Sequence, residues 1–346
     1  MSVIDDGAID AGGVPTQAPL ATFTVFAYNQ EAYVAEAVRG ALAQQYRPLQ
    51  VILSDDASTD RTFQVMAEAA RLCPADVELV LNRNPSNTGI ASHINKVLAM
   101  SGGRYVVMSA GDDISLPERT SVSVAALAGD PHRRLALHSA VVNIDAEGHK
   151  LYVRQNPYRD LTDEPAVVLE RNVYLTGSSV TVDRSIYAGF PQLVEGVVNE
   201  DKVTAFRCSF SGGAVYVDQP LVHYRAGVGV STLNGAILDR RNDPVVESRY
   251  IRTGLERRRS VLEQMLLDSE RGPIAKEFDP SLREKIANEA RMLDRMLAFT
   301  KKPSVFAVPG IMITAGFTRK TLKLAVLFLM PWTFSLYKRL EGIRGR

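Results

Sequence analysis

The sequence predicts a doubly wound α/β fold with a mixed sheet and a helical extension at the C-terminal end. Four short apolar runs, separated by three helical patterns, fill the first 110 residues. The runs do not alternate in polarity, which is typical of parallel strands covered on both faces. Each run ends in polar residues, and sheets of this kind bind ligands beyond the carboxyl ends of their strands. We therefore expect a ligand site at one edge of the sheet.

The elements follow in order along the chain. The four strands are expected at residues 21–29, 49–58, 77–82 and 105–109, and the helices between them at 31–45, 59–73 and 92–100. In the first helix the apolar positions fall on one face: Tyr33, Val34, Ala37, Val38 and Leu42. Residues 134–154 predict two strands around a turn at Glu147–Gly148, so the sheet becomes mixed. Further short strands are expected within 177–190 and 214–225, on either side of a helix in 199–210.

Composition shifts divide the chain into four parts. Residues 1–20 carry acids, glycines and prolines where a signal peptide needs a basic start and an apolar run, so we expect a mobile leader. Residues 21–235 form the main domain, with a first half at 21–130 and a second at 131–235. Residues 236–300 predict two amphipathic helices with a break at Gly272–Pro273, an accessory layer or a contact for a homo-oligomer.

Residues 301–346 form a basic, apolar tail with nine Lys or Arg residues and one acid, Glu341. Its apolar runs are shorter than the ~20 residues that span a bilayer. Trp332 and Tyr337 lie near Lys338 and Arg339, a pattern that predicts a segment on a membrane surface. A helix that caps the core and an oligomer contact are the alternatives.

The overall composition excludes several classes of protein. The 346 residues carry a net charge of +1, which gives no electrostatic basis for binding nucleic acid. Cys73 and Cys208 are the only cysteines and lie far apart, so neither a disulfide framework nor a zinc site is expected. A reducing, cytoplasmic setting fits this usage best.

Adjacent aspartates after the fourth strand suggest how a phosphate group could be held. Neither common glycine-rich phosphate loop is present, so a phosphate needs another counter-charge. Asp112 and Asp113 follow Gly111 and offer the hard oxygen ligands that Mg²⁺ or Mn²⁺ prefers when bridging a diphosphate. The alternative is a solvated turn in which one aspartate caps the helix that starts near Pro117.

The ends of the second and third strands carry further candidates. An aspartate such as Asp55 or Asp56 can accept the N3–H of uracil or thymine, although Asp56 or Ser58 could equally cap a helix. Asn87, Gly89 and Asn95 flank the third helix, where glycine allows a sharp turn and Asn95 can bind main chain. His93 is expected to be a hydrogen-bonded structural histidine.

Together, residues 24–62, 84–98 and 102–119 resemble the nucleotide-sugar-binding half of family 2 glycosyltransferases. The resemblance covers about residues 21–130 and implies a GT-A type fold, a Rossmann-like nucleotide-binding half within a mixed sheet. It implies a metal site at Asp112 and Asp113, with Asp113 the better candidate; Ala110 stands where many members have one more aspartate. The nucleotide-sugar site then comprises Ala27, Tyr28, Asn29, Asp55, Asp56, Asn87, Gly89, Asn95 and Asp112, of which Tyr28, Asn29 and Asp56 contact the nucleoside.

The second half carries the same resemblance at two places. Residues 199–207 resemble the family's Glu-Asp element, which implies Asp201 as catalytic base with Glu200 beside it. The alternative is helix-start chemistry, in which the helix dipole lowers the pKa of both carboxylates. Residues 221–225 resemble a strand that ends in Tyr-Arg, so His223 or Arg225 could contact phosphate or serve the structure.

The sequence thus predicts inverting, metal-dependent transfer of a sugar from a nucleoside diphosphate to an acceptor hydroxyl. UDP- or dTDP-type donors are favoured and GDP is allowed, with Mn²⁺ or Mg²⁺ as cofactor. The tail suggests a peripheral enzyme on the cytoplasmic face of the inner membrane that acts on a lipid-linked glycan for surface polysaccharide or glycolipid synthesis. The alternatives are a sugar-nucleotide nucleotidyltransferase and a membrane-associated scaffold whose site has decayed.

Overall fold

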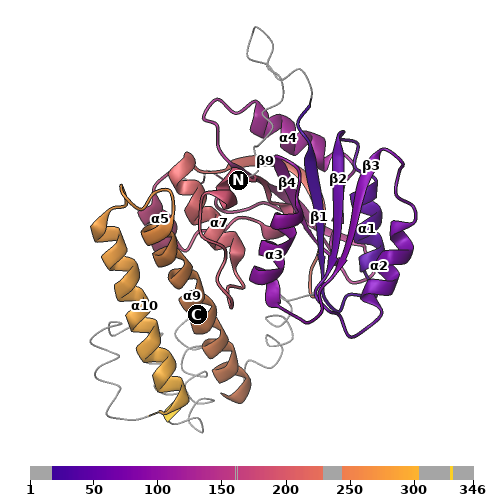
Figure 1. Ribbon diagram of the computed structural model, residues 1–346. Coiled ribbons are helices and arrows are strands. Elements are labelled where there is room, and N and C mark those ends of the chain that lie inside the picture. Colours follow the sequence, from indigo (N-terminus) through magenta and orange to yellow (C-terminus); the bar gives the residue numbers. More distant parts are fainter. Residues whose placement is uncertain (1–17, 160, 162, 229–243, 304–327, 330–346) are drawn as a thin grey trace. The chain divides into compact units, whose positions relative to one another are not determined.

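A computed structural model describes residues 18–159, 161, 163–228, 244–303 and 328–329 (Figure 1). The chain forms two compact units, one of Met1–Gly196 with Glu200–Ala226, the other of Val197–Asn199 with Gly227–Arg346. The predicted leader and the predicted membrane tail lie almost entirely outside the described residues. Within them, no helix is both long enough and apolar enough to span a bilayer.

The first unit begins with alternating strands and helices, as predicted. They are β1 (Ala21–Ala27), α1 (Val34–Leu42), β2 (Leu49–Asp55), α2 (Thr62–Ala70), β3 (Val77–Arg83), α3 (Gly89–Met100) and β4 (Tyr105–Ala110). The strands pair in parallel, in the spatial order β3-β2-β1-β4. Ala27 lies opposite Asp55, and Phe26 opposite Ala110, so the carboxyl ends of β1, β2 and β4 form one edge.

The strand order reverses direction between β1 and β4. The chain moves outward through β1, β2 and β3, then crosses back through α3 to β4 on the other side of β1. Because such crossovers are right-handed, the reversal puts α3 on the opposite face of the sheet from α1 and α2, as Figure 1 shows. The fold is therefore doubly wound, and its switch point, where ligands of such sheets bind, lies beyond Ala27 and Ala110.

Burial follows the position of each strand in the sheet. Phe23, Val25, Val51 and Val107 are fully buried on the central strands. β3 has only β2 as a neighbour, and there Leu81 is 40% exposed. The continuous apolar pattern thus predicted the central strands correctly, whereas β3 is a half-exposed edge strand.

The rest of the first unit makes the sheet mixed, as predicted. The strands are β5 (Ile114–Ser115), β6 (Ala136–Ile144), β7 (Lys150–Arg154), β8 (Thr181–Asp183) and β9 (Val215–Arg225). Between them lie the helices α4 (Arg119–Ala128), α5 (Pro165–Arg171), η1 (Gly177–Ser179), α6 (Ser185–Ala188), α7 (Glu200–Cys208) and η2 (Ser209–Ser211). The sheet continues from β4 as β8-β6-β9-β5, with β7 on β6. β8 runs antiparallel to both β4 and β6.

In the described part of the second unit, the long helices α9 (Pro244–Arg271) and α10 (Pro280–Lys301) pack against each other. The predicted break at Gly272–Pro273 falls just after the end of α9. Charged pairs join the two helices: Arg258 Nε lies 2.8 Å from Glu289 Oε1, and Arg259 Nε lies 2.8 Å from Asp294 Oδ1. The predicted pair of amphipathic helices is therefore present, and its role in an oligomer stays a prediction.

Replacing Phe23 should strongly destabilise the first unit. Phe23→Ala removes a fully buried ring and the contact with the Arg119 guanidinium 5.6 Å from its centre. We expect a loss of about 3–5 kcal/mol in the free energy of unfolding, measured by urea denaturation. Leu72→Ala, at a position 71% exposed, is the control and should change it by less than about 0.5 kcal/mol. Equal effects would contradict the core assignment.

Candidate functional site at the switch point

The turn after β1 leaves one aromatic side chain at the edge of the sheet. Tyr28 is 42% exposed and follows directly on buried Ala27, whose carbonyl accepts the Asp56 N–H at 2.9 Å. Asn29 has a left-handed backbone (φ 51°), and its Oδ1 accepts the Thr59 N–H at 2.9 Å. The predicted nucleoside-contacting residues of β1 thus lie beside the turn that follows β2.

Asp55 is fully buried and serves the turn after β2. Its Oδ2 accepts the Ser58 N–H at 3.0 Å, and its Oδ1 accepts the Ser58 hydroxyl. Arg83 Nε lies 3.5 Å from Oδ2. Both carboxylate oxygens are therefore engaged within the chain, and Asp55 holds the turn that follows β2.

Asp56 caps the third helix, the alternative that the sequence left open. Its Oδ1 accepts hydrogen bonds from Asn84 Nδ2 (2.7 Å) and Thr88 N (3.0 Å), and its Oδ2 accepts one from Gly89 N (2.9 Å). Burial by itself would raise the pKa of Asp56, but these hydrogen bonds outweigh it and lower the pKa. Asp56 is thus ionised at neutral pH and holds the start of α3.

Gly89 and Asn87 complete the same cap. Gly89 has φ 77°, a conformation that favours glycine, and its N–H also lies 3.1 Å from Asn87 Oδ1. The prediction of a sharp turn at this glycine is confirmed.

Asn95 and His93, further along α3, are held by other parts of the chain. Asn95 Nδ2 donates to Leu193 O at 2.8 Å, and its Oδ1 accepts the Leu193 N–H at 3.0 Å. The expectation that Asn95 binds main chain is confirmed, because both ends of its amide bind Leu193, and its nucleotide contact stays a prediction. His93 is buried, with Nε2 2.6 Å from Ser54 Oγ, as expected of a structural histidine.

Asp112 and Asp113 lie at the switch point, on the loop between β4 and β5, and both are buried. The loop begins at Gly111, whose N–H donates to Phe26 O at 2.8 Å. A Cβ on Gly111 would lie 2.6 Å from Gln30 Oε1, 3.0 Å from Ala27 Cβ and 3.2 Å from Phe26 O, so a side chain here would displace Gln30 and crowd the end of β1. The predicted metal pair thus packs directly against the end of β1.

The two carboxylates carry charge that nearby side chains only partly balance. Asp113 Oδ1 accepts the Arg225 main-chain N–H at 2.8 Å, and the Gln30 side chain hydrogen-bonds to Asp112. Burial raises the pKa of Asp112, and burial together with the Asp112 charge raises that of Asp113 well above its usual range. In the described part of the chain, neither carboxylate forms an ion pair with a lysine or arginine side chain. Two buried carboxylates that lack an ion-pair partner among the described residues offer the hard oxygen ligands that a divalent cation prefers.

Arg119 and Arg225 are fully buried near the pair. Arg119 Nη2 donates to Met108 O at 2.6 Å; burial lowers its pKa to about 9, while Asp113 acts to raise it. Arg225 Nε donates to Asp112 O at 3.0 Å, so its guanidinium points into the protein and does not reach out to a phosphate. Of the two roles that the sequence left open for Arg225, these bonds favour the structural one. No pattern in the sequence indicated that Arg119 belongs to the site. Gln30, in contrast, is one of the polar residues that follow the first apolar run.

Glu200 and Asp201 are the first two residues of α7, and both are half-buried. Burial and the adjacent Asp201 charge raise the pKa of Glu200, and burial raises that of Asp201. The alternative reading, in which the helix dipole lowers these pKa values, does not hold, because burial dominates. Each carboxyl group is thus a stronger base when ionised than an exposed one.

The helix η1 connects this pair to the same edge of the sheet. A Cβ on Gly177 would lie 3.3 Å from Glu200 Oε1, so η1 lies beside the start of α7. η1 leads into β8, which runs antiparallel to β4, and Met108 N donates to Val180 O at 3.0 Å. Residues that precede β8 therefore lie alongside the carboxyl end of β4. Glu200 and Asp201 approach the edge that carries Asp112 and Asp113.

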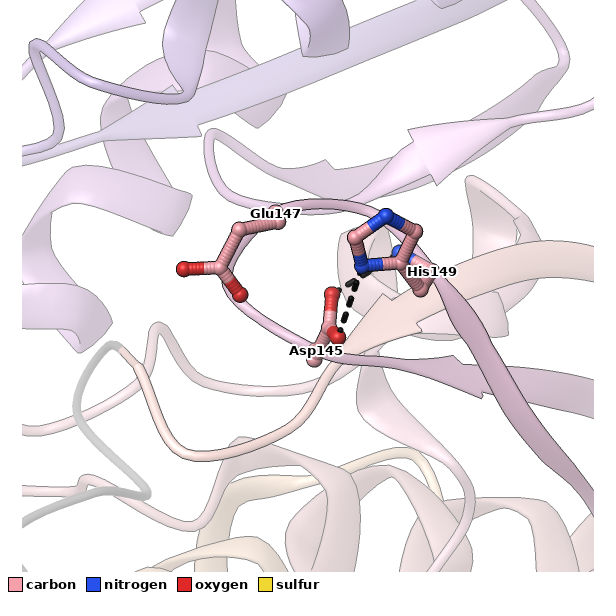
Figure 2. A group of neighbouring side chains, drawn as sticks. All are labelled: Asp145, Glu147 and His149. Atoms are coloured by element: carbon pink, nitrogen blue, oxygen red, sulfur yellow. Dashed lines mark hydrogen bonds and ion pairs between the residues drawn. The ribbon is translucent and has the colours of Figure 1, made fainter.

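A further group of potential metal ligands, Asp145, Glu147 and His149, lies in the turn between β6 and β7 (Figure 2). Among the described residues it is the one group of three or more such side chains within reach of a shared ion. Asp145 Oδ1 accepts the His149 N–H at 2.8 Å, and the His149 ring lies 3.0 Å from Oδ2. These bonds are those of the turn, two of the three residues are exposed, and we assign no site to them.

A doubly wound sheet with polar and acidic side chains at its switch-point edge is an architecture typical of nucleotide-binding domains. Comparison with known proteins gives the family. Residues 22–187 match the model described as "Glycosyl transferase family 2", and these residues form a glycosyltransferase domain of that family.

The similar proteins agree with this assignment. The chain is 35% identical over 106 residues to a Bacillus subtilis (strain 168) protein, EpsE, that carries a glycosyltransferase name. The match covers 31% of this chain and 37% of EpsE, so it spans little more than a third of that relative. The fold is similar to the crystal structure of S. aureus TarS 1-349 (TM-score 0.56, 14% identity, 94% of this chain and 92% of that one). The TarS complex with UDP-GlcNAc gives a TM-score of 0.55 at 15% identity, over 88% and 81% of the two chains. The predicted GT-A type fold is confirmed.

Removing the Asp56 cap should destabilise the protein in a pH-dependent way. Asp56→Ala leaves the donors of Asn84, Thr88 and Gly89 without their acceptor, and we expect a loss of about 1–3 kcal/mol at pH 7. Because folding lowers the pKa of Asp56, its stabilisation is complete above the unfolded pKa of about 3.9 and is lost as the pH falls below it.

The measurement is urea denaturation of the wild-type protein and Asp56→Ala between pH 7 and pH 2. Glu68→Ala, which removes an exposed carboxylate on α2, is the control and should cost little. A difference between wild type and Asp56→Ala that stays constant over the whole range would show that the Asp56 charge does not hold the helix.

Proposed function

We propose that this protein transfers a sugar from a nucleoside diphosphate to an acceptor hydroxyl with inversion of configuration. One observation carries the proposal: within a family 2 glycosyltransferase domain, Tyr28, the Asp112–Asp113 pair and the Glu200–Asp201 pair lie along one edge of the sheet. Tyr28 can bind a base, the Asp112–Asp113 pair can bind a diphosphate through a cation, and the Glu200–Asp201 pair can accept a proton.

Tyr28 and Asp56 form the proposed nucleoside side of the site. The Tyr28 ring is exposed at the end of β1, so it can stack on a base. Asp56 lies beside the same turn and is ionised, so a carboxylate oxygen can accept an N3–H from uracil or thymine in addition to its bonds to α3. This favours UDP- or dTDP-type donors and leaves GDP allowed.

Asp112 and Asp113 are the residues that would hold a divalent cation, Mn²⁺ or Mg²⁺. Such an ion, when bound, supplies positive charge to the leaving diphosphate. The chain itself contributes two buried carboxylates on a loop that Gly111 seats against β1. Ala110 offers no third carboxylate, so the cation would take its remaining ligands from the nucleotide and water.

Asp201 is the proposed base, with Glu200 beside it. A carboxylate whose pKa burial has raised takes up the proton of an acceptor hydroxyl more readily, a contribution of ~10²–10⁴-fold to the rate. Inversion needs one such base on the acceptor side and no carboxylate nucleophile. Glu200 lies beside Asp201 in the first turn of α7, where burial and the Asp201 charge raise the pKa of Glu200 to about 8.

A sugar-nucleotide nucleotidyltransferase is the second candidate and fits less well. That class begins with a glycine-rich, basic loop after the first strand. Here β1 leads into Tyr28, Asn29, Gln30 and Glu31, with no glycine and no basic residue. A scaffold with a decayed site is the third candidate and would bind neither nucleotide nor metal.

The proposals for the acceptor and for the location in the cell rest on the sequence of the tail, residues 301–346. Its basic and apolar character supports a peripheral position on the cytoplasmic face of the inner membrane and a lipid-linked glycan as acceptor. Surface polysaccharide or glycolipid synthesis is the process in which such a transfer fits. The helices α9 and α10 remain the candidate surface for a homo-oligomer.

Replacing the base should separate transfer from donor binding. Asp201→Asn should lower kcat by ~10²–10⁴-fold while nucleotide affinity stays within about twofold, because the base acts only on the acceptor proton. In the wild-type protein kcat should increase as the pH rises past the pKa of Asp201, which lies above the ordinary carboxyl range. This increase should be absent in Asp201→Asn. The control Glu195→Gln, at an exposed carboxylate, should leave both unchanged. Equal loss of affinity and kcat would refute the role of Asp201.

Replacing Asp113 should act on donor binding instead. Asp113→Ala removes one of two predicted cation ligands, so UDP affinity in the presence of Mn²⁺ should fall by at least about tenfold, while the affinity in EDTA changes little. Isothermal titration calorimetry with UDP, dTDP and GDP, each with Mn²⁺ and with EDTA, measures this. A wild-type protein that binds none of the three would identify the decayed scaffold.

A further inference from the structure

Arg225 ends β9 and binds both residues of the acidic pair, by two different groups. Its main-chain N–H donates to Asp113 Oδ1 at 2.8 Å, and its Nε donates to Asp112 O at 3.0 Å. The residue is only 2% exposed. One arginine thus fixes the side chain of Asp113 and the main chain of Asp112.

The rest of the guanidinium ties this loop to two other parts of the unit. Nη1 donates to Asp145 O (3.1 Å) and Ala146 O (2.6 Å), in the turn between β6 and β7. Nη2 pairs with Glu36 in the first turn of α1, and the guanidinium carbon lies 4.7 Å above the centre of the Tyr33 ring. The planar fork of an arginine can satisfy these directions at once, whereas the ammonium group of a lysine cannot.

These contacts span the two halves of the domain. Tyr33 and Glu36 follow β1, whose end carries the proposed base-binding Tyr28. The turn at Asp145 belongs to the second half. The short β5 adds one link, because Ile114 pairs with His223 of β9 directly after the acidic pair. Apart from Gly111 and the Gln30 contact, the position of the pair therefore depends on the end of β9.

We propose that Arg225 is a positioning residue of the donor site, which holds Asp112 and Asp113 in the geometry that binds a cation and its diphosphate. This inference rests on the proposed function and extends it to a residue that touches neither ligand. Asp113 Oδ1 is occupied by the Arg225 N–H, so the orientation of the carboxylate is set before a cation arrives. Losing the fork removes the bonds from the Arg225 side chain to Asp112 O, Asp145 O, Ala146 O and Glu36, so the acidic loop keeps only its weaker restraints.

The test compares nucleotide affinity with and without metal in Arg225→Lys. The substitution keeps the positive charge and the main-chain bond to Asp113 but removes the fork. Isothermal titration calorimetry uses Mn²⁺ and whichever of UDP, dTDP and GDP binds the wild-type protein most tightly. We expect the ratio of affinities in Mn²⁺ and in EDTA to fall at least tenfold. A general loss of structure would lower both affinities and leave the ratio unchanged.

Arg134→Lys is the matched control. Arg134 pairs with Asp130 (Nη2–Oδ1 2.6 Å), and its Nη1 lies 3.4 Å from Ala214 O, next to the opposite end of β9. Its substitution should leave the affinity ratio within twofold of wild type. Glu36→Ala removes the more exposed partner of Arg225 and should lower the ratio at least threefold, and this variant decides the question if Arg225→Lys does not fold.

The outcomes separate the two proposals. A folded Arg225→Lys with a ratio within twofold of wild type would overturn the positioning role alone, and so would an unchanged ratio in Glu36→Ala if Arg225→Lys is unfolded. A wild-type protein that binds none of the nucleotides with Mn²⁺ would overturn the proposed function and this inference with it.

Discussion

Two neighbouring carboxylates buried at the end of β4 impose the constraint around which the first unit is arranged. Removing a carboxylate from water costs several kcal/mol unless other groups replace the lost solvation, and two adjacent charges raise this cost. The chain offsets part of it with the buried arginines Arg119 and Arg225 and with the Gln30 side chain. The remaining imbalance is what a cation would satisfy. The loop that carries the two carboxylates is thus fixed in place, and a bound cation would supply the remaining positive charge.

Several polar side chains at the same edge of the sheet form hydrogen bonds to other parts of the protein. Asp55 closes a turn, Asp56 starts α3, and Asn95 binds Leu193. These bonds fix the main chain around the strand end that carries the exposed Tyr28. A site built on side chains that are already immobilised loses less entropy when a ligand binds. Residues that make no direct ligand contact can therefore still determine affinity.

The acidic pair at the start of α7 shows how two electrostatic effects compete. A helix N-terminus stabilises an ionised carboxylate by about 0.3–1 kcal/mol, which is less than about one pKa unit. Burial can raise the pKa of a carboxyl group by as many as 3–5 units. Burial therefore decides the direction at Glu200 and Asp201, and the pair becomes more basic. The same helix-start residues on an open surface would be poor bases.

The sequence by itself determined the strand and helix order of the first unit, the mixed sheet and the strand-end position of the acidic residues, because apolar periodicity and turn residues act locally. It did not determine which of those residues face a ligand. Asn95 was predicted to belong to the ligand site and Arg225 was left open between two roles. Their partners, Leu193 and Asp112, lie about a hundred residues away in the chain. The raised pKa values of Glu200 and Asp201 likewise depend on burial by distant segments. Only the tertiary structure decides these points, since hydrogen-bond partners and burial are set by which segments the fold brings together.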